Sequence, residues 1–83
     1  MYRLIPGFNE YGISAGGTIW DREENAMVPI YRNGGHVKVN LRGAFNVSVH
    51  KLVFLAYKGS IKGKTIEHID GNTSNNHVSN LHG

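Results

Sequence analysis

The sequence predicts a small α+β domain built from an antiparallel β-meander or hairpins and one helix. Apolar and polar residues alternate in several short runs, which is typical of half-exposed strands. Eleven glycines are spread along the 83 residues and separate these runs instead of forming a linker. Only residues 49–58 have apolar side chains at helical spacing. A chain of this length is expected to form a single domain, residues 1–83, with a small core.

The first part of the chain predicts a β-meander. Short strands are expected at residues 11–14 and 18–21, joined by the turn Ala-Gly-Gly at residues 15–17. Residues 26–31 are expected to continue the meander at a sheet edge, because Pro29 has no N–H for a ladder hydrogen bond.

A hairpin follows the turn signal Asn-Gly-Gly at residues 33–35. The alternation in residues 36–41 places three apolar side chains on one face, namely Val37, Val39 and Leu41. After a turn at residues 42–43, the alternation resumes with Phe45, Val47 and Val49.

Ser48 is predicted to be the N-cap of a helix over residues 49–58, which Gly59 ends at the C′ position. The apolar stripe of this helix consists of Leu52, Val53, Ala56 and Tyr57. A basic loop at 60–64 leads to a short strand at 65–69. A polar, Asn-rich loop over 70–80 then precedes a further strand that begins at Leu81.

The charge distribution indicates an anionic partner. Residues 32–64 contain seven basic and no acidic side chains, whereas each flanking part has a net charge of −2. The basic residues are Arg32, Lys38, Arg42, Lys51, Lys58, Lys62 and Lys64. They predict contacts with the phosphates of DNA; the alternative is an ordinary solvated face.

The amino-acid composition excludes several classes of protein. Without cysteine, the chain forms neither a disulfide scaffold nor a thiolate zinc site. The N-terminal residues contain no apolar run long enough for a signal peptide or a membrane span. We therefore expect a soluble protein of the cytoplasm.

Glu67 and His68 are the candidate chemical groups. An imidazole, whose ordinary pKa is ~6.5, acts as a base at neutral pH, and a carboxylate is a hard oxygen ligand for Mg²⁺ or Mn²⁺. Neighbouring residues on a strand point to opposite faces, so joint action on one phosphate requires the strand to end or bend here. We expect the strand to end or bend at the Asp70-Gly71 turn.

The run EHIDGNTSNNHVSNL, residues 67–81, resembles the core of the HNH endonucleases, in particular the intron-associated homing endonucleases of phages and bacteria. This resemblance implies a ββα-metal unit, also called a His-Me finger, in which His68 is the general base. It implies that Asn80 fixes the loop and orients the histidine, and that Glu67 is a ligand of a single Mg²⁺ or Mn²⁺. The host-cell cytoplasm is then the expected location, if a phage encodes the protein.

The resemblance extends over nearly the entire chain. Residues 1–48 resemble the modular segment that often precedes such nuclease domains, through Tyr11, Ile13, Ser14, Gly17 and Ile19. Residues 49–83 then comprise the helix and a partial HNH core.

The helix that carries the last Asn or His ligand of the family does not follow Leu81 in this sequence. The ββα-metal unit is therefore predicted to be truncated. The leading function is a metal-dependent DNA endonuclease, a phosphodiester hydrolase that nicks or cleaves DNA. The alternatives are an inactive HNH-derived protein that binds DNA or a host protein, and a split enzyme completed by a second polypeptide or subunit.

Overall fold

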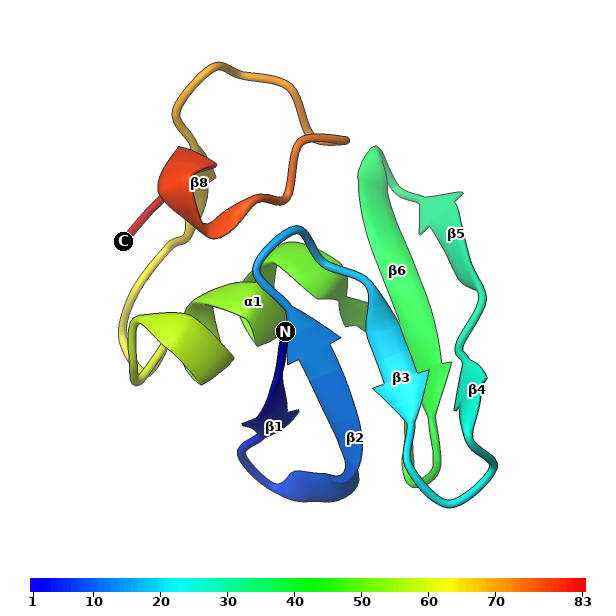
Figure 1. Cartoon of the computed structure of the whole chain (residues 1–83). Coiled ribbons are helices and arrows are strands. Elements are labelled where there is room, and N and C mark those ends of the chain that lie inside the picture. Colours follow the sequence, from blue (N-terminus) through cyan, green and yellow to red (C-terminus); the bar gives the residue numbers. More distant parts are fainter.

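Three small antiparallel sheets and one α-helix make up the structure (Figure 1). The computed structural model describes all 83 residues. The first sheet contains β1 (Tyr2–Ile5), β2 (Phe8–Ser14), β3 (Ile19–Asp21) and β4 (Ala26–Met27), and the second contains β5 (Ile30–Asn33), β6 (His36–Leu41) and β7 (Ala44–Ser48). Helix α1 (Val49–Tyr57) follows, and then come β8 (Glu67–His68), a 3₁₀ turn (Val78–Asn80) and β9 (Leu81–His82). Strands β8 and β9 form the third sheet, and the predicted α+β class is confirmed.

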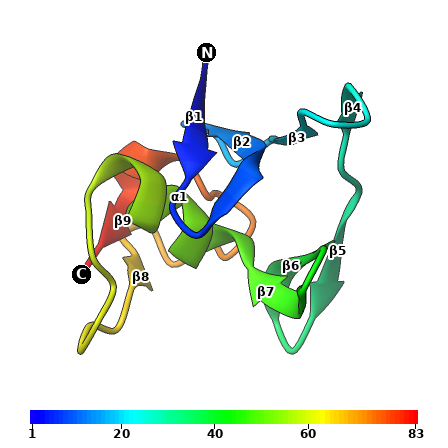
Figure 2. The same cartoon turned by 90° about the horizontal axis from the view of Figure 1, so that it is seen from below.

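Helix α1 lies at the centre, with the β8–β9 pair on one side and strands β6 and β7 on the other (Figure 2). It contributes four buried apolar side chains, Val49, Leu52, Val53 and Phe54. These join a core cluster of 13 buried residues that draws on both large sheets and on β9. Burial of the apolar surface of this cluster makes the main favourable contribution to the stability of such a fold. The helix, nine residues long, is too short to span a bilayer.

The predicted helix boundaries are nearly correct. Ser48 occupies the N-cap position, but its side chain does not cap the helix. Its Oγ instead accepts a hydrogen bond from Lys38 Nζ at 2.9 Å. The helix ends at Tyr57, one residue earlier than predicted, and Gly59 follows with a φ of 116° that favours glycine.

The predicted strands at 11–14 and 18–21 correspond to β2, which begins three residues earlier, and to β3, which begins one residue later, and the turn between them packs tightly. Gly17 in this turn has a φ of 95°. A Cβ atom at this position would lie 3.1 Å from Cγ1 of Val49 and 3.4 Å from Cβ of Asn76. Glycine therefore lets the turn approach both the helix and the Asn-rich loop.

One expectation for the strands is wrong in part, and one strand was not predicted. Residues 26–31 do not form one edge segment, because the chain leaves the first sheet after β4 and enters the second at β5, with Pro29 at the break. Strand β1 has no counterpart among the predicted elements.

The hairpin of β6 and β7 is confirmed, and Val37, Val39 and Leu41 are buried as predicted. Phe45, however, is 79% exposed. The pairing of β6 with β7 shifts between Val39 and Leu41, and Asn46 adopts a φ of 57°. Such an irregularity re-aims side chains, so the alternation in β7 does not place Phe45 in the core.

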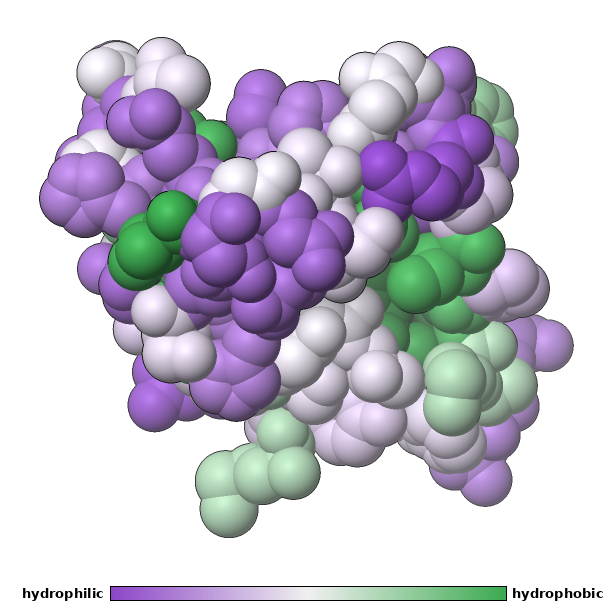
Figure 3. Space-filling view, turned by 90° about the horizontal axis from the view of Figure 1, so that it is seen from above, coloured by the Kyte–Doolittle hydropathy of each residue, from purple (hydrophilic) through white to green (hydrophobic).

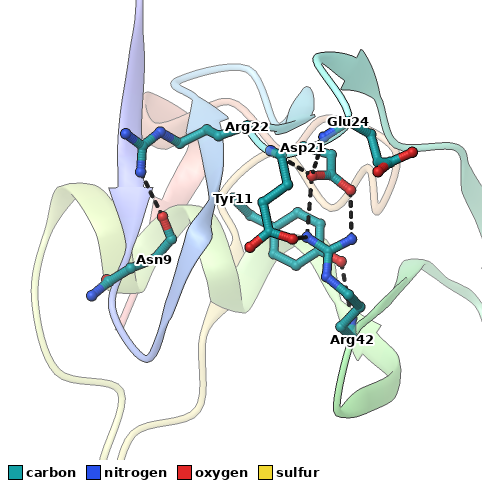
Figure 4. A network of polar contacts seen from close by, with 7 residues as sticks. Asn9, Tyr11, Asp21, Arg22, Glu24 and Arg42 are labelled. Carbon is teal, nitrogen blue, oxygen red and sulfur yellow. Dashed lines mark hydrogen bonds and ion pairs between the residues drawn. The ribbon is translucent and has the colours of Figure 1, made fainter.

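A polar network joins the first two sheets (Figure 4). The Arg42 guanidinium donates two hydrogen bonds to the Asp21 carboxylate, at 2.7 and 3.1 Å. The Arg42 backbone N–H donates to the Tyr11 hydroxyl at 3.0 Å. Hydrogen bonding from Arg42 lowers the pKa of Asp21 to about 2. Arg42, predicted from the sequence to bind DNA, is thus engaged between the sheets.

Candidate active site

Strand β8 ends at His68, where the chain turns at once. The strand covers only Glu67–His68, not residues 65–69 as predicted, and the Gly71 N–H donates to the His68 carbonyl at 3.0 Å. Glu67 lies opposite His82 on β9, and His68 lies opposite the fully buried Leu81. The Glu67 side chain is therefore directed to the exposed face of the β8–β9 pair, and His68 to the inner face.

Asn76 holds the imidazole of His68. Its Oδ1 lies 2.6 Å from Nε2 of His68. A carboxamide oxygen only accepts hydrogen bonds, so Nε2 carries the proton of the neutral ring. Nδ1 then keeps its lone pair and makes no hydrogen bond within the protein. A half-buried imidazole fixed in this way can accept a proton at Nδ1.

The position of Asn76 is set by the turn between β2 and β3. Asn76 is only 5% exposed and packs close to Gly17 of that turn. Two residues further on, the Val78 N–H donates to the carbonyl of Ala15 at 2.8 Å. The N-terminal half of the chain thus fixes the loop that orients His68.

Asn80 closes the Asn-rich loop. Its side chain is buried, accepts from the Asp70 N–H at 3.1 Å, and donates to Asp70 Oδ1 at 2.8 Å and to the Asn75 carbonyl at 2.9 Å. Hydrogen bonds from Asn75, Asn72 and Asn80 lower the pKa of Asp70. Asn80 makes no hydrogen bond with His68, so the orienting bond that the resemblance attributes to Asn80 is made by Asn76.

Two further imidazoles surround His68. The ring of His50 lies 4.8 Å and that of His36 6.0 Å from the ring of His68, measured between centroids. Burial lowers the pKa of His50 to about 4, with smaller contributions from the neighbouring basic side chains of His68, His36, Lys51 and Lys38.

Asn76, His36 and His50 are not among the site residues predicted from the sequence. Asn76 falls within the motif that carries the resemblance, so the motif contained a signal for it. His36 and His50 reach His68 only through tertiary packing, which no local pattern indicates.

The lowered pKa of His50 predicts a loss of stability in acid. The unfolded chain protonates this imidazole near ~6.5 and the folded chain only near about 4, so the unfolded state binds more protons between these values. As the pH falls through this window, the free energy of unfolding is expected to decrease by about 3 kcal/mol through His50. Urea denaturation across the pH range should show a flatter profile for His50→Gln. His77→Gln, which removes an exposed imidazole, should keep the steep profile. An unchanged profile in His50→Gln would contradict the assignment.

The basic residues fall into two groups. Besides Arg42, Arg32 is engaged, because its guanidinium donates to Ser74 Oγ at 2.6 Å and Thr73 Oγ1 at 2.9 Å and thereby docks the Asn-rich loop on β5. The lysines form no ion pair, since the only two salt bridges are made by Arg42.

Seen from the side of the Asn-rich loop, the surface is mainly hydrophilic, with a hydrophobic patch to one side (Figure 3).

The structure does not bring together a complete set of side-chain ligands for a metal ion. No group of three or more His, Cys, Asp or Glu side chains comes together to hold an ion. Glu67 is exposed and makes no hydrogen bond or ion pair, so its carboxylate is available as a single oxygen ligand. His82 is its cross-strand neighbour.

Residues 47–82 match the family model described as HNH endonuclease. The fold is similar to a solved structure described as "DNA binding and cleavage by the HNH homing endonuclease I-HmuI", with a TM-score of 0.70 and 23% sequence identity. The match covers 98% of this chain and 50% of the other, so the chain spans half of the length of that relative. No curated protein shows a significant match. The family match covers the segment that carries the resemblance found in the sequence, and residues 47–82 are similar to the HNH endonucleases.

Proposed function

We propose that this chain acts in metal-dependent hydrolysis of DNA phosphodiester bonds, as an HNH homing-endonuclease-like nuclease. The observation that carries the proposal is the hydrogen bond between His68 Nε2 and Asn76 Oδ1 within the segment that matches the HNH family. The similar solved structure is described as binding and cleaving DNA, which supports DNA as the substrate.

His68 is the general base of this proposal. Its Nδ1 takes a proton from the attacking water, and Asn76 keeps the Nε2 proton in place as charge develops on the ring. The end of β8 and the turn at Asp70–Gly71 leave the imidazole at the last position of a rigid strand pair instead of on a mobile loop.

Glu67 is the proposed ligand for Mg²⁺ or Mn²⁺, because hard cations prefer carboxylate oxygens. When bound, such an ion supplies charge stabilisation at the scissile phosphate and its leaving oxygen. The described residues provide one such ligand and no complete site. Completion by a second polypeptide or subunit stays a prediction.

The proposed DNA-binding surface consists of lysines without carboxylate partners. Lys58 donates to the Leu81 carbonyl at 2.7 Å, and the ammonium groups of Lys51 and Lys62 form no hydrogen bond with the protein. Contacts of this kind supply affinity for phosphates without sequence specificity.

Nicking of supercoiled plasmid tests the proposal. The purified protein is expected to convert supercoiled DNA to nicked or linear product with Mg²⁺ or Mn²⁺, and EDTA should abolish the reaction. Adding excess Mn²⁺ after the EDTA should restore the reaction. Absence of product under every metal, from a sample that binds DNA, would refute hydrolysis by this chain.

DNA binding without cleavage is the second candidate, and the lack of a three-ligand metal group favours it. In this case Lys58→Glu and Lys62→Glu should each weaken duplex binding about 5-fold at low salt, with the effect shrinking as salt rises. Arg22→Glu is the matched control, because Arg22 lies in the acidic N-terminal part and its guanidinium bonds only to the Asn9 carbonyl. Equal losses in all three variants would indicate a general charge effect.

Asn76 is proposed to be a positioning residue, and Asn76→Asp tests this role. The aspartate accepts the same hydrogen bond but adds a negative charge that stabilises the protonated ring, so the pH profile of cleavage should shift to higher pH. Asn76→Ala should lower the cleavage rate about 10- to 100-fold with little change in DNA affinity. A merely structural role would lower the stability in both variants and leave the pH profile where it is.

A further inference from the structure

A pocket lies beside the imidazole cluster, between β6, the start of α1 and residues 64–66. Its volume is about 320 Å³, and polar side chains form most of its lining. The lining residues used below are His36, Lys38, Ser48, His50, Lys51 and Lys64. It is separate from the apolar pocket at residues 27–30.

The lining of this pocket is positively charged and contains no carboxylate. Lys38, Lys51 and Lys64 all contribute, and none of them forms an ion pair. Lys38 is held toward the start of α1 by its hydrogen bond with Ser48 Oγ. Three lysine side chains that line one pocket without a counter-charge raise the electrostatic potential and favour an anion in the pocket.

Two unsatisfied imidazole nitrogens adjoin the same space. Nδ1 of His36 and Nδ1 of His50 are buried and have no hydrogen-bond partner, and His50 as a whole is only 4% exposed. Buried polar atoms are almost always hydrogen-bonded, because leaving one unpaired is costly. An oxygen-rich ligand would satisfy such groups.

A phosphate group meets both requirements, since it combines negative charge with several acceptor oxygens. We propose that this pocket binds a backbone phosphate of the DNA strand, next to the phosphate that His68 faces. The ring of His50, which lines the pocket, lies 4.8 Å from that of His68. A phosphate anchored here would fix the register of the strand relative to the base. This inference rests on the proposed function for its choice of DNA.

Ligand titration of the full chain tests the pocket directly. The imidazole NMR signals of His36 and His50 are followed while inorganic phosphate, a thymidine dinucleotide with one phosphodiester, or its uncharged methylphosphonate analogue is added. The phosphodiester should shift both signals saturably, and the methylphosphonate should not. In the Lys38→Met/Lys64→Met variant, the affinity for the phosphodiester should fall at least about 5-fold.

Duplex binding supplies the second measurement. Relative to wild type, Lys38→Met/Lys64→Met should lower the slope of log affinity against log salt concentration by about 1, for one lost phosphate contact. Arg22→Met is the control, since Arg22 lies outside the pocket, and it should keep the wild-type slope. Circular dichroism verifies that each variant is folded.

Each outcome decides the inference. Shifts with inorganic phosphate alone would show a free-anion site and overturn the assignment to the DNA backbone. No shift of His36 or His50 with any probe, or an unchanged salt slope in the double variant, would overturn the pocket altogether. Failure of the pocket and failure of the proposed function are distinguishable, because His68→Ala should lower the rate of plasmid cleavage by about 10²- to 10⁴-fold while keeping the phosphodiester shifts.

Discussion

Replacing His68 with alanine is expected to lower the rate of DNA cleavage by about 10²- to 10⁴-fold, the range over which a positioned general base accelerates proton transfer. The imidazole at the end of β8 is the only ring that Asn76 holds by a hydrogen bond, and its Nδ1 remains free to take a proton. Single-turnover nicking of supercoiled plasmid with Mn²⁺ measures the effect.

The matched control for this variant is His77→Ala. His77 is exposed and lies in the same loop, and its side chain forms hydrogen bonds only with Ser79. It should therefore cleave at close to the wild-type rate. DNA affinity should stay within about 2-fold in both variants, since the proposed role of His68 is proton transfer and the proposed phosphate contacts are made by lysines. Equal product from wild type and His68→Ala would contradict the role of this histidine.

Asn80→Ala is expected to lower the free energy of unfolding by about 3 kcal/mol, which is a large part of the stability of a small domain. The substitution removes three hydrogen bonds at a side chain that is only 8% exposed. It leaves the Asp70 N–H and the Asn75 carbonyl without their partner. Chemical denaturation followed by circular dichroism measures this change.

Asn72→Ala is the control for the loss of an asparagine in the same loop. The Asn72 side chain is exposed and accepts one hydrogen bond, from the Ser74 N–H at 3.0 Å. Its loss should lower the free energy of unfolding by about 1 kcal/mol or less. If Asn80→Ala were as mild as Asn72→Ala, Asn80 would not close the loop as described.

Elements that depend on local pattern could be predicted from the sequence. The burial of Val37 and Val39 follows from strict alternation, and the helix end at Gly59 follows from the chemistry of a positive φ. Division of residues 26–31 between two sheets could not be predicted, because it depends on which strands become neighbours and not on propensity.

The same distinction applies to the candidate site. The motif pointed to His68 and to the loop-closing role of Asn80, since both lie within one short run of residues. The choice of Asn76 as the partner of His68 depends on the packing of Gly17 against the loop, more than fifty residues away in the sequence. The approach of His36 and His50 depends on how β6 and α1 pack beside β8. The sequence around each of these residues gives no local signal for such contacts between distant segments.

The imidazole ¹⁵N chemical shifts of His68 at neutral pH test the central claim most directly, because they show which ring nitrogen carries the proton. The hydrogen bond to Asn76 predicts a proton on Nε2 and a free lone pair on Nδ1, and it predicts that Asn76→Ala loses this preference. A proton on Nδ1 in the wild-type protein would contradict the account, since the nitrogen left for catalysis could not then accept a proton from water.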